Sequence, residues 1–398
     1  MPKLLIVNIT ANQGSTGKIS EQVGMLMQER GWDVYLAHGA RRVNPSRLNS
    51  IPFSNITTEY LHALKSLLFD ADGLGSTRAT KKLIDKIKEF KPDVIHLHNL
   101  HGYYLNFKLL FRYLNRTSIP VVMTLHDCWS FTGHCTHFVT ANCEKWVTGC
   151  DNCPLSAVYP KRSLFLDKSR RNYNLKDKYL GNSPNLYIVA VSEWMAGNVK
   201  RSILKNHPIS VCHNGIDLST FQKHEKRNDG IFRILGVANV WYIDKGLNDI
   251  YELRKLLPLD KFRITLVGLS KKQVEQLPAG IDGITRISNQ AELAKLYSDS
   301  DVLINPTYAD TFPTINLEAL ACGTPVITYK TGGSPEAIDL KTGVVVELGD
   351  VVSMANSIKA MREAPLLSSD CRKRAELLFD KNKCFEKYVS LFEKLTLK

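Results

Sequence analysis

Two carboxylates, Asp310 and Glu318, stand eight positions apart in the run DVLINPTYADTFPTINLEALACGTPVITYKTGG, which occupies residues 301–333. The apolar residues 302–304 predict a strand buried on both faces, and a helix is predicted to follow the loop 306–314 and to end at Gly323. One acid therefore lies in the loop and the other inside the helix. The helix N-terminus between them offers backbone N–H groups to an anion. Two acids beside a phosphate cradle suit a nucleotide sugar, because one acid can bind ribose hydroxyls and the other sugar hydroxyls.

This run resembles the acidic signature of retaining glycosyltransferases of the GT-B fold, family 4. The shared features are two acids separated by seven residues and the block Glu-Ala-Leu-Ala-Cys-Gly-Thr-Pro that begins at Glu318. Other blocks match in the expected order, so the resemblance covers nearly all of the chain. It departs at Asp310, where the family usually has Glu, and the shorter side chain alters the contact expected with the sugar. The resemblance implies an α/β protein with two Rossmann-like, doubly wound domains that face a cleft.

The hydrophobic pattern by itself favours the same fold class. Short apolar runs rich in β-branched residues alternate with helical segments, which indicates parallel sheets with helices on both faces. In such sheets a ligand binds outside the carboxyl ends of the strands. The predicted strands are 4–9, 34–37, 94–98, 121–125 and 187–191 in the first half, and 233–237, 264–267, 284–287, 302–304, 326–328 and 344–346 in the second.

The domain organisation follows from this alternation and from an Asn-Gly turn at position 214. We expect an N-terminal acceptor-side domain over 1–212, with a cysteine-rich insertion at 128–154, and a linker over 213–230. A nucleotide-sugar-binding domain is expected over 231–379. By resemblance, a C-terminal helix at 380–398 returns to the first domain.

A lysine and a glycine, Lys245 and Gly246, follow the first strand of the second half. The family usually offers an Arg six residues before this Lys, and both cations meet the diphosphate; here that position is Asn239. A cation that neutralises the departing diphosphate stabilises charge that develops in the transition state. With Asn239 in place of the Arg, Lys245 carries more of that role or another basic group substitutes. A solvated loop lysine is the alternative interpretation.

The resemblance assigns further roles around the two acids. Glu318 is expected to bind the ribose and Asp310 the hexose. The diphosphate is expected to contact Lys245 and the backbone of the segment formed by Thr311, Phe312, Pro313 and Thr314.

A glycine loop, ANQGSTGKI, follows the first strand of the chain. It is not a Walker A loop, because two residues separate Gly14 from Gly17 and Ile19 stands where Ser or Thr would hold magnesium. A plain strand-to-helix turn is the alternative. In the family this loop faces the donor phosphates and the acceptor, which makes Gly17 a donor-side candidate and Lys18 an acceptor-side candidate.

Histidines gather near the ends of two predicted strands of the first half. His126 ends the fourth strand, and in the family a His at this place contacts the donor sugar, so it joins Asp310 and Lys245 as a catalytic candidate. His98 and His101 are candidates for the acceptor side. His96 and His98 share one strand face, which faintly suggests a metal, but a buried, hydrogen-bonded pair is the preferred interpretation.

Five of the nine cysteines fall between Cys128 and Cys153. In a chain without export signals, clustered cysteines suggest a metal before a disulfide. We expect a structural zinc site, with free thiols or a disulfide as the alternatives, and the candidate ligands are Cys135, Cys143, Cys150 and Cys153.

Two short acidic pairs, Asp70 with Asp72 and Asp299 with Asp301, match the pattern by which other glycosyltransferases hold a divalent metal. We interpret both pairs as structural. The resembled family needs no catalytic metal, so no cofactor is expected for catalysis.

Charge is unevenly distributed along the chain. The net charge is +13, of which residues 1–212 carry +12 and residues 213–398 carry +1. Such a field favours an anionic surface, and the alternative is charge that serves solubility alone. No apolar run reaches 18 residues, and the first strand begins at Lys3, which leaves no room for a signal peptide. We therefore expect a cytoplasmic protein, peripheral at the anionic inner membrane face.

The block HDCWSFTGHC…CEKW…GC-x-x-CP, within residues 126–154, resembles a subgroup of these transferases found in bacterial exopolysaccharide and capsule (colanic-acid-type) biosynthesis. The resemblance therefore implies a retaining glycosyltransferase of surface polysaccharide biosynthesis. The donor is a UDP- or GDP-linked sugar, and the acceptor is a glycan or a sugar on a polyprenyl diphosphate. One alternative is a sugar-nucleotide 2-epimerase of the same architecture. A second alternative is a non-catalytic, zinc-stapled nucleic-acid-binding protein, although no basic stripe interleaved with aromatic residues supports nucleic acid as a partner.

Overall fold

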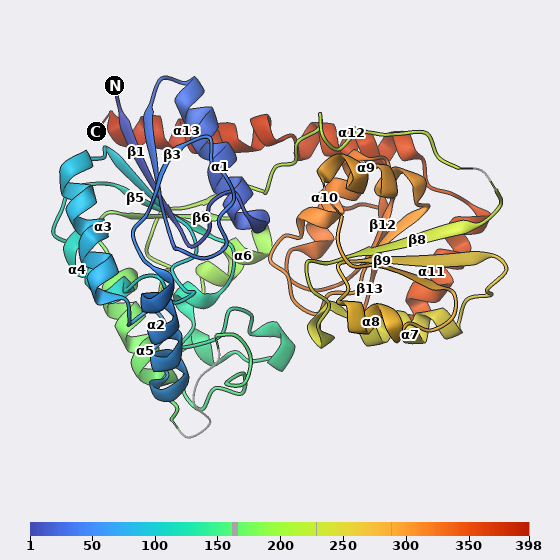
Figure 1. Ribbon diagram of the computed structural model, residues 1–398, viewed down its shortest axis with the longest axis horizontal. Coiled ribbons are helices and arrows are strands. Elements are labelled where there is room, and N and C mark those ends of the chain that lie inside the picture. Colours follow the sequence, from blue (N-terminus) through green and yellow to red (C-terminus); the bar gives the residue numbers. More distant parts are fainter. Residues whose placement is uncertain (161–165, 228, 288, 398) are drawn as a thin grey trace. The chain divides into compact units, whose positions relative to one another are not determined.

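The computed structural model divides the chain into two compact units (Figure 1). Met1–His213 and Phe385–Lys398 form the first unit, and Asn214–Cys384 forms the second. The structure describes residues 1–160, 166–227, 229–287 and 289–397. Position 228 of the expected linker and position 398 of the expected C-terminal helix lie outside the described residues.

The first unit is built on a seven-stranded, all-parallel sheet with the strand order β3-β2-β1-β4-β5-β6-β7. The central strands are almost wholly buried, as strands covered on both faces must be. The strands are β1 (Lys3–Asn8), β2 (Asp33–His38), β3 (Asn49–Pro52), β4 (Val94–Leu97), β5 (Val121–Leu125), β6 (Leu186–Ala190) and β7 (Ile209–Val211).

Helices cover both faces of this sheet (Figure 1). They are α1 (Gly14–Glu29), α2 (Ile56–Phe69), α3 (Thr77–Phe90), α4 (Phe107–Leu114), α5 (Ser169–Lys176) and α6 (Glu193–Val199). Between β5 and α5 the cysteine-rich insertion folds as loops and three single turns of 3-10 helix, Trp129–Phe131, Val139–Ala141 and Lys145–Val147.

The second unit repeats the scheme with six parallel strands in the order β10-β9-β8-β11-β12-β13. They are β8 (Phe232–Val237), β9 (Phe262–Val267), β10 (Ile281–Ile284), β11 (Val302–Asn305), β12 (Val326–Tyr329) and β13 (Gly343–Val346). The helices of this unit are α7 (Leu247–Lys255), α8 (Lys271–Glu275), α9 (Gln290–Asp299), α10 (Thr314–Ala321), α11 (Val351–Glu363) and α12 (Ser368–Leu378). The predicted fold class, two Rossmann-like α/β domains, is confirmed.

The last helix, α13 (Lys381–Thr396), supplies buried aromatic side chains to the first unit. The hydroxyl of Tyr388 lies 3.0 Å from Thr124 Oγ1 on β5, and the ring of Phe392 lies 6.5 Å from that of Trp32. These contacts bury the apolar stripe that the sequence shows at helical spacing.

Three strands differ from the sequence-based expectation. β10 occupies Ile281–Ile284 rather than 284–287, because Ile281 is the buried residue that pairs with Ile264, although Asp282 and Gly283 lower the β-propensity of the segment. β3 and β7 were not predicted, since both are short outer strands of the sheet with little apolar sequence.

Strand order reverses once in each sheet, between β1 and β4 and between β8 and β11. Loops that leave the carboxyl ends of such neighbouring strands go to opposite faces of the sheet and leave room for a ligand between them. A ligand site is therefore expected at one of these two places in each unit, next to the strands where the order reverses.

No helix among the described residues has both the length and the hydropathy needed to cross a bilayer.

Candidate functional site

In the second unit the site begins where β11 ends and α10 starts. All four residues of β11 are buried, and the loop that follows leads to Pro313, the N-cap of α10. Pro313 provides no capping side-chain hydrogen bond, so the first N–H groups of α10 are not occupied by a cap. Asn316, in the first turn, accepts a hydrogen bond from Asn305 at 2.9 Å and ties the helix start to the strand end. The result is a fixed helix N-terminus that is suited to an anion.

An ion pair lies beside this helix start. Lys245 Nζ is 3.1 Å from Asp310 Oδ2 and 3.2 Å from Thr307 Oγ1. Lys245 ends the turn that follows β8, and Asp310 belongs to the loop after β11, so the pair joins the loops of two neighbouring strands. The predicted cation and the first predicted acid are thus direct partners, and both side chains are partly exposed to solvent.

Gly246 makes this approach of the two loops sterically feasible. Its φ is +74°, and a Cβ atom there would lie 2.2 Å from the carbonyl oxygen of Pro306. Gly332 acts in the same way on the other side of the loop, since its Cβ would lie 1.7 Å from the carbonyl oxygen of Asp310. Both positions need a residue without a side chain.

Glu318, the second predicted acid, is held by a buried tyrosine. The hydroxyl of Tyr297 on α9 donates to Glu318 Oε2 at 2.8 Å. Burial, together with the neighbouring Glu318 charge, raises the pKa of Tyr297 well above its usual value, so it remains a neutral donor. Tyr297 therefore fixes the orientation of Glu318, and nothing in the spacing of the sequence identified it as a partner.

The other donor-side candidates of the second unit lie around this core. Thr311 and Phe312 are buried, and the carbonyl of Phe312 accepts a hydrogen bond from Asn214 Nδ2 at 2.9 Å. Thr314 is the first residue of α10. Asn239 is exposed in the loop after β8. The segment 311–314 thus enters the site through its backbone, while Asn239 offers a neutral side chain at the surface.

In the first unit the glycine loop leads from β1 into α1. A Cβ on Gly17 would lie 2.7 Å from Thr10 Oγ1, so the first turn of α1 packs directly on the loop. Lys18 follows on α1 and is half-buried. Gln13, the N-cap, makes no capping side-chain hydrogen bond, as at α10.

The predicted histidines come together at the ends of β4 and β5. His98 Nδ1 lies 2.9 Å from His126 Nε2, and their rings are stacked with centroids 5.2 Å apart. His101 Nε2 lies 2.6 Å from Asp127 Oδ2. His96 is buried within β4 and bonds Thr124 Oγ1 at 2.8 Å, which agrees with the interpretation as a buried, hydrogen-bonded residue.

Burial sets the ionisation of these groups. It lowers the pKa of His96 to about 3 and, partly offset by Asp127, that of His126 to about 4. It also holds the pKa of His98 well below its usual value. At His101 the Asp127 carboxylate outweighs burial and raises the pKa. In turn, His101 lowers the pKa of Asp127 to about 2, against the effect of burial.

The cysteine-rich insertion gives no ready-made metal site. No disulfide joins the cysteines of this insertion, and no three His, Cys, Asp or Glu side chains of the described residues converge so that they could hold a metal ion. Cys135 lies against Cys153, and Cys150 accepts from the backbone N–H of Gly133 at 3.2 Å. Zinc at these cysteines stays a prediction, and the thiols would have to rearrange to reach the Zn–S distance of about 2.3 Å.

A buried lysine, which the sequence did not single out, ties this insertion to α5. Lys176 Nζ donates to the carbonyl oxygens of Trp129 at 2.6 Å and Thr132 at 2.9 Å, and it lies 3.4 Å from the centroid of the Trp129 ring. Burial lowers its pKa to about 8.

Three of the four paired aspartates have protein partners. Asp70 accepts from the backbone N–H of Lys168 at 2.7 Å, while Asp299 and Asp301 face Arg and Lys side chains. Asp72 differs, because both of its carboxylate oxygens are buried without a hydrogen-bond partner among the residues that the structure describes. Its negative charge acts on His101 and Lys176. Asp72 therefore has unused hydrogen-bonding capacity in the first unit.

Comparison with known families agrees with this geometry. Residues 22–220 match the family model described as Glycosyltransferase Family 4, and residues 232–363 match the model described as Glycosyl transferases group 1. The chain belongs to glycosyltransferase family 4. The second match spans the ion pair of Lys245 and Asp310 as well as Glu318.

Similar proteins support the family and the fold. A putative colanic acid biosynthesis glycosyl transferase, WcaC of Escherichia coli K12, is 25% identical over 82% of each chain. Among solved structures, sucrose-phosphate synthase from Thermosynechococcus elongatus has a TM-score of 0.74 at 17% identity over 99% of each chain. Anabaena HepE, solved in complex with UDP, has a TM-score of 0.66 at 14% identity, over 99% of this chain and all of that one. The predicted GT-B fold class is confirmed.

Substitution of Gly246 by Ala tests the approach of the two loops. Because the Cβ would meet the Pro306 carbonyl at a positive φ, we expect Gly246→Ala to destabilise the second unit by about 1–3 kcal/mol. The melting temperature should fall by several degrees. The matched control is Gly197→Ala in α6, where a Cβ meets nothing within 4 Å and should be neutral or stabilising. Equal melting temperatures for the two variants would contradict this account.

The buried histidines predict how stability depends on pH. His96, His98 and His126 have lowered pKa values, so their contribution to stability is present above pH 6.5 and is lost as the pH falls toward the folded values. For His96 the loss reaches about 2 kcal/mol at pH 5. The pKa of His101 is raised, so this residue stabilises the folded state as the pH falls. The three histidines with lowered pKa values have the opposite effect, and together they outweigh it.

We expect the melting temperature to fall between pH 7 and pH 5, and to fall less in His96→Gln, which removes one of these groups. Thermal unfolding followed by circular dichroism measures both slopes. A His96→Gln variant that loses as much stability as the wild type over this range would show that His96 is not held neutral.

Proposed function

We propose that this protein is a retaining glycosyltransferase that transfers a sugar from a UDP- or GDP-linked donor to a glycan or polyprenyl-diphosphate-linked acceptor in surface polysaccharide biosynthesis. The observation that carries the proposal is the Lys245–Asp310 ion pair beside the uncapped start of α10, with Glu318 oriented by Tyr297.

Donor binding follows from this arrangement. The diphosphate lies at the N-terminus of α10, where backbone N–H groups and the Lys245 ammonium attract its charge. Glu318 accepts hydrogen bonds from the ribose hydroxyls, and Asp310 accepts from the hexose. Anabaena HepE, which shares the fold, has been solved with UDP and with UDP-glucose, and this supports a nucleotide sugar as the ligand class.

Catalysis is assigned to charge stabilisation and positioning. Lys245 stabilises the diphosphate as it leaves. Asp310 is paired with Lys245, whose ammonium also donates to Thr307, and this pairing favours a role in binding over one as a nucleophile. The acceptor oxygen then bonds the anomeric carbon on the face from which the diphosphate departs, and the departing phosphate takes the acceptor proton. This route retains configuration and requires no metal.

The acceptor is assigned to the basic first unit. By resemblance to the family, we assign His98, His101 and Lys18 to the acceptor and His126 to the hexose of the donor. His98, His101 and His126 follow the carboxyl ends of β4 and β5, and Lys18 lies in the first turns of α1, where parallel sheets bind ligands.

The biosynthetic context is inferred from relatives. Besides the E. coli protein, a capsular polysaccharide biosynthesis glycosyltransferase of Staphylococcus aureus, CapM, is 24% identical over 52% of this chain and 60% of its own length. We infer from this context that the acceptor is carried on a membrane lipid, and this inference favours a protein that works at the inner face of the membrane.

The donor is identified by a thermal-shift panel of UDP, GDP and their sugars, since a ligand that binds only the folded state raises the melting temperature with its concentration. Glu318→Gln is then expected to weaken binding of that nucleotide about 10- to 100-fold, because an amide loses the charge-assisted hydrogen bonds to the ribose.

The variant should fold normally, since Gln can still accept from Tyr297. Calorimetric titration measures the affinity. Glu363→Gln, an exposed acid of α11, is the control and should bind like the wild type. Unchanged affinity in Glu318→Gln would refute the role of this acid.

Lys245→Gln tests the assignment of the leaving-group cation. Because the charge on the diphosphate grows in the transition state, we expect kcat to fall about 10²- to 10³-fold and nucleotide affinity to fall less. The readout is the rate at which nucleoside diphosphate is released in the presence of acceptor and saturating donor. Lys330→Gln, which breaks the exposed ion pair with Glu347, should leave kcat unchanged. A product formed from the donor without any acceptor would point to the epimerase reaction instead.

A further inference from the structure

The helix α2 (Ile56–Phe69) buries polar side chains and exposes apolar ones, whereas its neighbour α3 buries mainly apolar side chains. The polar side chains that α2 buries are Glu59, His62 and Ser66. Large apolar side chains cover its outer face, each between 44% and 63% exposed: Tyr60, Leu61, Leu64, Leu67, Leu68 and Phe69. Five of them, at positions 60, 61, 64, 67 and 68, recur at helical spacing and form one stripe.

Hydrogen bonds hold α2 in this orientation. Glu59 accepts from the backbone N–H of Ala40 at 2.6 Å and pairs with Arg41 Nε at 2.7 Å. His62 accepts through Nε2 from the backbone N–H of Gly75 at 2.9 Å, and its Nδ1 lies 2.7 Å from the carbonyl oxygen of Tyr103. A rotation that buried the leucines would break all four contacts and leave a carboxylate without its partners, so the apolar stripe has to face outward.

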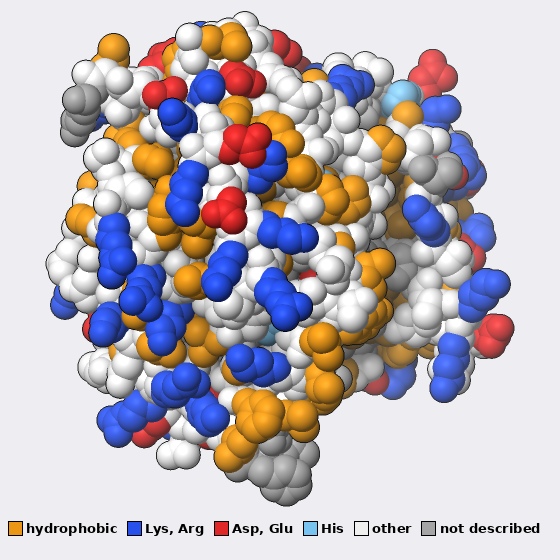
Figure 2. Space-filling view, turned by 60° about the vertical axis from the view of Figure 1, so that its left-hand side comes forward, with side chains coloured by type: hydrophobic (Ala, Val, Ile, Leu, Met, Phe, Trp, Pro, Cys, Tyr) orange, Lys and Arg blue, Asp and Glu red, His pale blue; other side chains and the backbone are white. Residues whose placement is uncertain are grey.

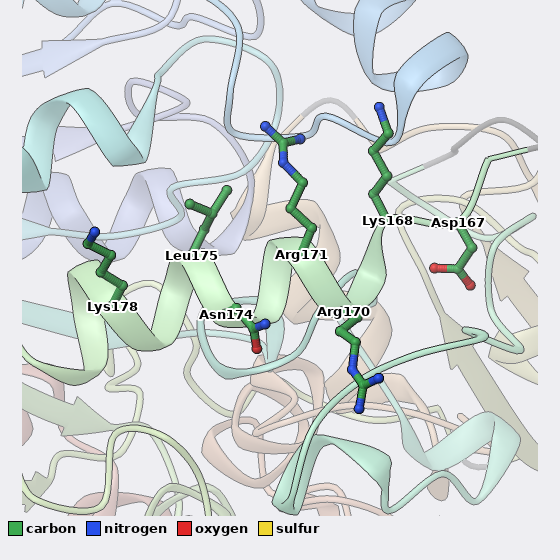
Figure 3. Close-up of a pocket in the computed structure, with 7 residues that line it drawn as sticks. All are labelled: Asp167, Lys168, Arg170, Arg171, Asn174, Leu175 and Lys178. Carbon is green, nitrogen blue, oxygen red and sulfur yellow. The ribbon is translucent and has the colours of Figure 1, made fainter.

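Cations flank the stripe at both ends. The Arg41 guanidinium lies 5.4 Å from the centroid of the Tyr60 ring, and Lys168 Nζ lies 5.7 Å from that of Phe69. Figure 3 shows Lys168 and Arg171 extending on one side of α5 and Arg170 on the other. These side chains help to line an open hollow of about 550 Å³. Figure 2 shows Lys and Arg side chains spread over this side of the first unit, with hydrophobic side chains gathered at its lower edge.

Charge decides between the partners that an apolar stripe could have. Glu59 is the one acid of α2, and it is buried in its pair with Arg41, so the exposed face of the helix carries no negative charge. A second copy of the chain docked through α2 would bring Arg41 and Lys168 close to the same cations of its partner, at an electrostatic cost. Anionic lipid headgroups attract these cations, while the leucines enter the acyl boundary.

We propose that α2 is the membrane-docking element of this protein and lies in the interface of an anionic phospholipid bilayer. Leu61, Leu64 and Leu68 enter the boundary between headgroups and acyl chains, and Arg41, Lys65 and Lys168 bind the phosphates. This deepens the proposed function, in which the acceptor is carried in the membrane. It is tested without nucleotide sugar or acceptor, so its failure is separate from a failure of the transferase assignment.

The experiment is co-sedimentation of the full chain with vesicles of phosphatidylcholine alone and of phosphatidylcholine mixed with phosphatidylglycerol. We expect the wild type to bind the mixed vesicles and to be released by salt. The double variant Leu64→Gln/Leu68→Gln should bind them at least about ten-fold more weakly, because the inserted leucines are lost. Both residues are exposed, so its melting temperature should equal or exceed that of the wild type.

The matched control is Leu259→Gln/Leu340→Gln, which changes two exposed leucines of the second unit and should bind like the wild type. If the wild type binds the mixed vesicles no more strongly than vesicles of phosphatidylcholine alone, the proposal is wrong. Equal binding by the α2 variant also overturns it, since the basic surface alone would then suffice. A wild-type dimer that becomes monomeric in the α2 variant, measured by light scattering, would assign the stripe to a second copy instead.

Discussion

Close backbone contact between two loops of the second unit is the constraint on which the candidate donor site depends. β8 and β11 are neighbours where the strand order reverses, and the turn after β8 reaches the loop after β11 because Gly246 has no side chain to strike Pro306. That contact sets Lys245 opposite Asp310, beside the start of α10. Backbone sterics therefore position the charges, and the charges in turn define where a diphosphate can lie.

Elsewhere in the chain, buried polar groups fix the orientation of the side chains and helices that they contact. Tyr297 orients Glu318 from within the core, His101 and Asp127 fix each other, and Glu59 and His62 set the rotation of α2. Each is costly to bury unless it is fully hydrogen-bonded, so each specifies one orientation of the element that carries it. Asp72 stands apart from this pattern, since its carboxylate is buried without a hydrogen-bond partner in the described part of the chain.

Much of the fold was predictable because it depends on local patterns. Strands buried on both faces must be short, apolar and β-branched, and most of the strands of the two sheets satisfied that rule. The resemblance to family 4 also assigned Lys245, Asp310 and Glu318 to one nucleotide sugar, which amounts to predicting that they lie near one another.

The remaining features depend on contacts between distant residues. Tyr297 lies 21 positions before Glu318 and is a common core residue, so nothing local marks it as a partner. The inverted polarity of α2 cannot be seen without knowing which face the sheet covers. The register of β10 follows from pairing with β9 and overrides a more β-prone segment beside it. The cysteine spacing suggests a metal, but spacing does not fix how the thiols converge.

A crystal structure of the full chain with the nucleoside diphosphate that most stabilises it is the most direct test of the central claim. The account predicts that the phosphates lie within hydrogen-bonding distance of the first backbone N–H groups of α10 and of Lys245 Nζ, and that the ribose hydroxyls bond Glu318. A nucleotide bound elsewhere on the chain, or one with its phosphates directed away from α10, would contradict it.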